Sequence, residues 1–194
     1  KLFPKVQLVI HQARPTEIVQ LLQNGEADIG IATEALDKAN NLAHFAFYEW
    51  SHALVVPNGH PLTLKPYLSL EDVAAYPIIT YYPGITGRHR IDEAFEAVGI
   101  TPNIVISALD SDVIKTYVEL GLGVGILASM SFNPQRDLGL QLINVSRLFQ
   151  SNTAQIAVRY GHYLRGYSYQ FINLCAPALT ESVVRETLLK EISE

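Results

Sequence analysis

The sequence contains a single cysteine, Cys175, among 194 residues, so no disulfide can form within the chain. A chain without disulfides fits a reducing compartment, and we expect the protein in the cytoplasm. Apolar runs are short throughout, and none approaches the roughly 18 residues that a membrane-spanning helix needs. No secretory signal peptide opens the sequence. It begins at Lys1 with what resembles the end of a helix, so we expect a fragment of a longer protein.

The sequence also has fewer basic than acidic residues. The chain has 14 lysines and arginines against 19 aspartates and glutamates, for a net charge of −5. Nucleic-acid surfaces are basic, so if the parent protein binds DNA, we expect a different segment to do so. Apolar residues make up 48% and charged residues 17%, which is typical of a globular chain. The length allows one sizeable core or two small ones.

Signatures of catalysis are mostly absent. The sequence has no phosphate-binding loop that ends in Gly-Lys-Ser/Thr and no G-x-S-x-G nucleophile motif. Gly121-x-Gly123-x-Gly125 leads from a helix into a strand, the wrong direction for a dinucleotide site. The six histidines lack metal-ligand spacing, and Cys175 falls on an apolar helix face, where a small core residue is expected. We therefore expect no catalytic residue, no metal and no cofactor.

The most informative stretch that is present is residues 110–130, DSDVIKTYVELGLGVGILASM. Apolar residues recur at helical spacing through 111–120, and the Asp110 side chain can accept hydrogen bonds from the first free amides. Gly121 can adopt the left-handed conformation that ends a helix. Residues 123–127 are apolar and uncharged, as in a buried parallel strand. This pattern predicts a helix that turns directly into a central strand.

The rest of the chain alternates between extended and helical patterns, which predicts an α/β protein. We expect one parallel βαβ unit within residues 6–32 and a second parallel sheet within residues 78–127. Two small sheets joined by extended crossovers would leave a cleft between them, with ligands at the carboxyl ends of strands. The predicted strands are 6–10, 28–32, 42–48, 52–56, 78–82, 103–107, 123–127, 140–145 and 153–160, and the predicted helices are 15–24, 69–75, 88–98, 110–120, 164–176 and 181–192.

Two threonines are the candidate ligand contacts. Thr86-Gly87-Arg88 follows Ile85 in a loop between a strand and a helix, where free amides and a partial positive charge hold anions. From spacing alone, a simple helix cap at Thr86 is favoured about two to one, although one hydroxyl can serve both roles. Thr33 follows an apolar strand and would point toward the ligand region of a parallel sheet. An ordinary loop threonine is favoured there about three to one.

Several long motifs resemble those of LysR-type transcriptional regulators, in particular the CysB/Cbl-like branch that controls cysteine and sulfur metabolism. The motifs that carry this resemblance are FPKVQL, LLQNGEADIGIATEAL, NGHPL, YPIITY, GITGR and DSDVIKTYVELGLGVGILASM, and the similarity covers nearly the whole chain. The resemblance implies an effector-binding domain of two Rossmann-like subdomains, as in type II periplasmic binding proteins. Residues 1–47 and 152–194 would form subdomain I, and residues 50–149 would form subdomain II.

The resemblance also implies a ligand. In that branch a sulfur-related anion or an acetylated serine sits between the subdomains, and the matching threonines are Thr33 of I-A-T-E and Thr86 of T-G-R. This agreement makes ligand binding the preferred interpretation at both positions, together with Ile85, Gly87 and Arg88. The candidate effectors are sulfate, thiosulfate, O-acetylserine, N-acetylserine and adenosine phosphosulfate.

The resemblance further implies binding partners, and the family has segments that this sequence lacks. The protein would be a homodimer or homotetramer, with DNA bound through a helix-turn-helix domain that is absent from this sequence. A T-x-T-Q strand of the family, which supplies further anion contacts, also lies upstream. Two other functions stay open from the residues alone. One is a solute-binding protein for a sulfur-containing or organic anion, and the other, poorly supported, is a small α/β transferase that acts on an acetylated amino acid.

Overall fold

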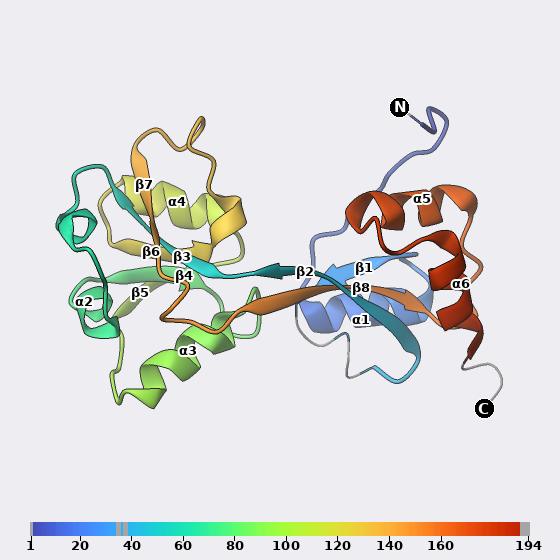
Figure 1. Cartoon of the computed structure of the whole chain (residues 1–194), viewed down its shortest axis with the longest axis horizontal. Helices are drawn as coiled ribbons and strands as arrows, with labels where there is room; N and C mark the ends of the chain where they lie inside the picture. The colour runs from blue at the N-terminus through green and yellow to red at the C-terminus, as the bar shows by residue number, and fades with distance from the viewer. Residues whose placement is uncertain (1, 34–35, 37–38, 191–194) are drawn as a thin grey trace. The chain divides into compact units, whose positions relative to one another are not determined.

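The computed structural model describes residues 2–33, 36 and 39–190. The chain divides into two compact units, and we describe each separately. Unit 1 comprises residues 1–48 and 153–194, and unit 2 comprises residues 49–152. The elements, shown in Figure 1, are α1 (Pro15–Asn24), β1 (Gly30–Ala32), β2 (Leu42–Trp50), β3 (His52–Pro57), η2 (Pro61–Leu64), α2 (Leu70–Ala74), β4 (Ile78–Tyr81), α3 (Arg88–Ala97), β5 (Ile104–Ala108), α4 (Ser111–Glu119), β6 (Val124–Ala128), η3 (Ser129–Ser131), β7 (Leu140–Asn144), β8 (Asn152–Arg159), α5 (Gly166–Cys175) and α6 (Glu181–Lys190).

Unit 2 is built on a five-stranded sheet with the order β5-β4-β6-β3-β7. Strand β4 pairs in parallel with both β5 and β6, which confirms the parallel sheet predicted within residues 78–127. Strand β3 pairs antiparallel with β6 and β7, so the complete sheet is mixed. Figure 1 shows α3 and α4 on opposite sides of this sheet. The arrangement places the loop that follows β4 at the carboxyl end of a strand with parallel neighbours on both sides.

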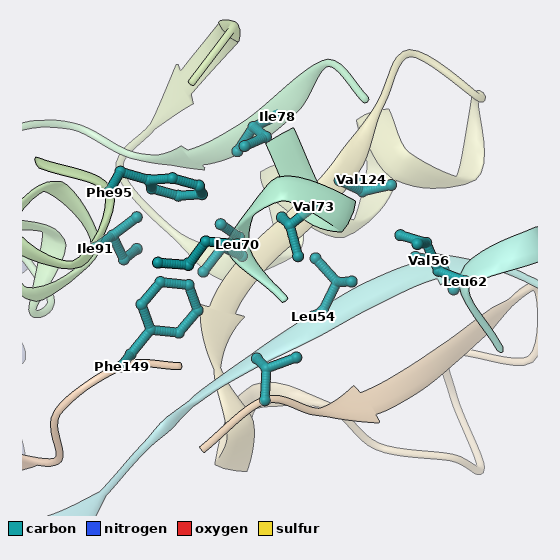
Figure 2. Close-up of a cluster of buried hydrophobic side chains, with 12 residues drawn as sticks. Leu54, Val56, Leu62, Leu70, Val73, Ile78, Ile91, Phe95, Val124 and Phe149 are labelled. Atoms are coloured by element: carbon teal, nitrogen blue, oxygen red, sulfur yellow. The ribbon is translucent and has the colours of Figure 1, made fainter. Parts of the chain in front are cut away.

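Alternation along the strands explains why both faces are covered. Successive side chains of a strand point to opposite faces. Leu54 of β3 therefore packs in a cluster with Ile91 and Phe95 of α3, whereas the next residue, Val55, packs with Ile114 of α4. Figure 2 shows the first of these clusters, in which α3 side chains meet Phe149 near the β7–β8 connection. Because both faces are buried, β6 is apolar along its whole length.

Helix α4 and strand β6 form as the sequence predicts. The Asp110 carboxylate accepts a hydrogen bond from the Val113 amide at 3.0 Å, so the predicted cap is confirmed. Gly121 has a φ of 77° and ends the helix in the left-handed region. Strand β6 then runs under the helix it follows, and a Cβ on Gly125 would lie 2.8 Å from a methyl group of Val118. The glycine therefore serves close helix–sheet packing.

Unit 1 differs from its predicted topology. Its three-stranded sheet has the order β1-β8-β2, and β1 pairs antiparallel with β8. Residues 6–10 have no regular secondary structure, and Leu8 and Ile10 are exposed. The predicted strand 6–10 and the parallel βαβ unit are therefore wrong. The alternation in this segment is that of a strand, but a strand forms only where another backbone supplies its hydrogen bonds, and β1 finds its partner in β8.

The core of unit 1 lies between its sheet and its helices. Leu22 of α1 packs with Leu42 and Ala157, and a second cluster joins the sheet to α5 and α6 through Ile172 and Val184. Cys175 lies at the edge of that second cluster and is half-buried, as expected for a small packing residue. Within the described residues, no helix is both long and apolar enough to cross a membrane.

Candidate functional site

The candidate site is the loop of residues 82–87 between β4 and α3, which we call the Thr86 loop. Strand β4 is buried along its whole length, and the chain emerges at Tyr82, which is exposed. In open α/β sheets, ligands bind at the carboxyl ends of strands, and helix N-termini attract anions. The ten-residue helix α3 begins directly after this loop. The loop therefore combines the two positions at which such folds hold anionic ligands.

Thr86 has an unusual backbone conformation. Among the described residues, it is the only residue other than glycine with a positive φ, at 47°, and Gly87 follows with a φ of 66°. A β-branched residue in the left-handed region costs about 1–3 kcal/mol and persists only where its surroundings hold it there. Helix α3 begins at Arg88, so its N-cap is Gly87, which has no side chain to cap it. The interpretation of Thr86 as a helix cap is therefore wrong.

The buried residue Arg88 forms hydrogen bonds at both ends of the Thr86 loop. Its Nη1 donates to the carbonyl oxygen of Tyr81 at 2.5 Å, and its Nε donates to Oδ1 of Asp92 at 2.8 Å. Its backbone amide donates to the carbonyl oxygen of Ile85 at 3.0 Å. The guanidinium group is thus directed at the protein's own backbone, and Ile85 is buried in the core beneath. A direct ligand contact by either residue stays a prediction.

His52 is a functional candidate that sequence analysis missed. The ring is buried, and its Nε2 lies 3.3 Å from the carbonyl oxygen of Thr86. Because a carbonyl can only accept, Nε2 carries the proton. Burial lowers the pKa of His52 to about 4, so the ring is neutral at physiological pH. The edges of Trp50 and Phe149 meet it at centroid distances of 5.0 and 5.7 Å. His52 therefore fixes the strained residue from a rigid aromatic cluster.

Asn152 is the second residue that sequence analysis missed. It is 3% exposed, and within the described part of the chain neither its Oδ1 nor its Nδ2 has a hydrogen-bond partner. Its carboxamide lies on the side of Gly87 where a side chain would project, with Cγ 2.8 Å and Nδ2 2.9 Å from a Cβ built there. Buried amides are nearly always paired, so this one needs an explanation. No sequence pattern distinguishes it, because the missing partners are visible only in three dimensions.

Thr33 lies in unit 1, whereas residues 85–88 lie in unit 2. Thr33 is half-buried, in a bend directly after β1. Since β1 pairs antiparallel with β8, the expectation that Thr33 ends a parallel strand is wrong. Its contact with a ligand stays a prediction. The described residues contain no group of three or more His, Cys, Asp or Glu side chains that could hold a metal ion.

The sequence matches the family model of the LysR substrate-binding domain over residues 1–180. With its mixed α/β sheets and this match, the chain belongs to the LysR substrate-binding domain family.

Two named relatives are similar to nearly the whole chain. The chain is 47% identical over 190 residues to the HTH-type transcriptional regulator SsuR of Burkholderia cenocepacia, covering 98% of the chain and 62% of SsuR. It is 46% identical over 191 residues to CysB of the same organism, covering 98% of the chain and 61% of CysB. The chain therefore spans about three fifths of the length of these relatives. Both are named as transcriptional regulators, which gives no support to a periplasmic solute-binding protein.

A solved structure supports the same assignment of fold. The cofactor-binding domain of the Cbl transcriptional regulator matches with a TM-score of 0.91 and 46% sequence identity. The match covers 97% of this chain and 82% of that structure. The resemblance to the CysB/Cbl-like branch of LysR-type regulators is thus confirmed, and the fold is that of their effector-binding domains.

Proposed function

We propose that this chain is the effector-sensing domain of a LysR-type transcriptional regulator of sulfur and cysteine metabolism. The family match and the names of relatives at 46–47% identity support this proposal. The whole protein would bind DNA through a helix-turn-helix domain outside this sequence and would act in the cytoplasm as a homodimer or homotetramer. It would not be an enzyme, since its proposed role is to bind a metabolite and leave it unchanged.

The observation that carries the proposed site is the conformation of Thr86. A strained threonine stands between the carboxyl end of β4 and the N-terminus of α3, with the His52 ring at its carbonyl oxygen. The side chain of Arg88 bonds the end of β4 at the carbonyl oxygen of Tyr81. Such strain is found mainly at functional sites. The N-terminus of a helix carries a partial charge of about +0.5, which favours an anion. The effector would be an anionic sulfur metabolite or an acetylserine, bound by Thr86, the backbone of residues 85–88 and Thr33.

Binding controls transcription only through a difference in affinity. An effector shifts a protein between two states by no more than the difference between its binding free energies for them. The proposed effector would therefore bind more tightly to the state of the full-length regulator that either favours or disfavours transcription. This effect belongs to the full-length protein, whereas the affinity of the effector for this domain can be measured directly.

The test is calorimetric titration of the domain with sulfate, thiosulfate, O-acetylserine, N-acetylserine and adenosine phosphosulfate, repeated on Thr86→Val. Valine keeps the β-branched shape and removes only the hydroxyl. A hydrogen bond to a charged group contributes about 1.5–3 kcal/mol, so we expect affinity to fall by about ten- to a hundred-fold.

The matched control is Thr116→Val, which removes an exposed hydroxyl of α4 that bonds the carbonyl oxygen of Asp112 within its own helix. This variant should bind the effector as the unaltered domain does. Unchanged affinity in Thr86→Val would exclude Thr86 from the site. Absence of binding by all five compounds to a folded domain would contradict the proposed function.

A further inference from the structure

The buried carboxamide of Asn152 has no hydrogen-bond partner among the residues that the structure describes. Its Nδ2 can donate two hydrogen bonds and its Oδ1 can accept two, and none of these is made. An unsatisfied buried polar group opposes folding. If this asparagine served only for packing, the fold would be less stable with it than with an apolar residue of similar size. An asparagine at this position is therefore best explained by a contact that forms only when a ligand is bound.

The chain segment that carries Asn152 is anchored by the residues just before it. Phe149 is buried in the core with Phe95 of α3 at a ring centroid distance of 6.3 Å. Oε1 of Gln150 accepts a hydrogen bond from Nη1 of Arg90 at 2.6 Å, which ties the segment to the first turn of α3. The carboxamide of Asn152 lies against Gly87 and makes no hydrogen bond to any described residue. Its unpaired amide nitrogen and oxygen therefore lie beside the Thr86 loop, where they can form hydrogen bonds with a ligand.

We propose that Asn152 is a specificity-determining residue of the effector site, an inference that rests on the proposed function. Its Nδ2 would donate to an oxygen of the bound anion, beside the positive end of α3 and the Arg90 guanidinium. Its Oδ1 would accept from an N–H or O–H group of the same ligand. The carboxamide thus favours an effector that carries a hydrogen-bond donor next to its anionic oxygens.

This requirement separates two classes of effector. Sulfate and thiosulfate offer only acceptors at neutral pH, so they can satisfy Nδ2 but leave Oδ1 unpaired. N-acetylserine offers an amide N–H and a hydroxyl beside its carboxylate, so it can satisfy both. A site with buried polar groups discriminates against ligands that leave one of them unpaired. Asn152 should therefore favour the organic class over the inorganic class.

The test compares the affinities of N-acetylserine and sulfate for the unaltered domain, Asn152→Leu and Thr86→Val. Leucine has the same branching and the same number of side-chain heavy atoms as asparagine, and it lacks both polar functions. We expect Asn152→Leu to weaken N-acetylserine at least tenfold more than it weakens sulfate. Thr86→Val should weaken both ligands by similar factors, because its hydroxyl addresses the anionic oxygens. Asn144→Leu, at an exposed position of β7, should change neither affinity.

Thermal unfolding without ligand separates binding from folding. Asn152→Leu should melt at the same temperature as the unaltered domain or higher, because it removes an unpaired polar group. A lower melting temperature together with unchanged affinities would show a purely structural asparagine and overturn the inference. Equal weakening of both ligands would leave Asn152 a simple anion donor and overturn its role in specificity. If the folded, unaltered domain binds neither N-acetylserine nor sulfate, this inference is overturned. The proposed function is contradicted only if thiosulfate, O-acetylserine and adenosine phosphosulfate also fail to bind.

Discussion

At the scale of single residues, the Thr86 loop depends on a neutral histidine. His52 donates from Nε2 to the carbonyl oxygen of Thr86, and no described residue bonds its Nδ1. A second proton would place an unpaired charge among Trp50 and Phe149, which is why burial lowers its pKa. The neutral ring still donates to the Thr86 carbonyl, and the folded chain favours this uncharged form because burial penalises the charge. This preference couples the stability of the fold to pH.

The sign of the coupling follows from the two protonation equilibria. The pKa of His52 is about 4 in the folded chain, against an ordinary value of 6.5 when unfolded. Between these values the unfolded chain binds a proton that the folded chain does not, so stability falls as pH falls from 6.5 to 4. Lowering the pH from 7 to 5 should cost about 2 kcal/mol through this residue alone.

Denaturation in urea at pH 7 and pH 5 measures this contribution. His52→Gln keeps an N–H donor near the Thr86 carbonyl and cannot be protonated in this range. Its unfolding free energy should fall less between the two pH values than that of the unaltered domain, by about 2 kcal/mol. His11→Gln, at an exposed position, is the matched control. Identical pH dependence in His52→Gln would contradict the neutral buried ring.

At the scale of elements, close packing of α4 on β6 requires glycine at position 125. A Cβ there would lie 2.8 Å from Val118 Cγ2 and 3.0 Å from Ile114 Cγ2. Overpacking of this kind typically costs about 1–3 kcal/mol. Gly125→Ala should therefore lower the free energy of unfolding by that amount in urea titration. Gly166→Ala, in the first turn of α5 with open space around it, should be neutral or stabilise by up to about 1 kcal/mol. Equal effects would contradict the packing argument.

Elements were predictable from sequence where the signals were local. Asp110 and Gly121 mark the ends of α4, and Ser69 accepts a hydrogen bond from the Asp72 amide in the capping box predicted for α2. Pairing was not predictable in unit 1. A period of two indicates a strand but does not say which backbone lies beside it, so β1 was assigned a parallel partner and has an antiparallel one.

The position of the candidate site could be predicted from the sequence, but its backbone conformation could not. The loop before α3 could be located because a glycine-containing segment joins an apolar strand to a clear helix. The shift of the N-cap from Thr86 to Gly87 could not be predicted, because it follows from a left-handed backbone at Thr86, whose carbonyl oxygen meets the His52 ring. That contact joins residues distant in sequence, and the unpaired state of Asn152 is likewise visible only in three dimensions.

At the scale of the whole molecule, each compact unit has its own core. The clusters that contain Leu54 and Val55 lie in unit 2, and those that contain Leu22 and Ile172 lie in unit 1. The chain passes from unit 1 to unit 2 after Tyr48 and returns after Asn152. The Thr86 loop, His52 and Asn152 all belong to unit 2, so the proposed anion contacts of this loop are set by a single core.

Binding of an anionic effector at the Thr86 loop can be tested by an amide-resolved NMR titration. The domain, labelled with ¹⁵N, would be titrated with N-acetylserine and separately with sulfate. We predict saturable shifts concentrated at the amides of residues 86–88, with the side-chain amide of Asn152 moving along the same binding curve. Shifts confined to other surfaces, or shifts that never saturate, would contradict the claim.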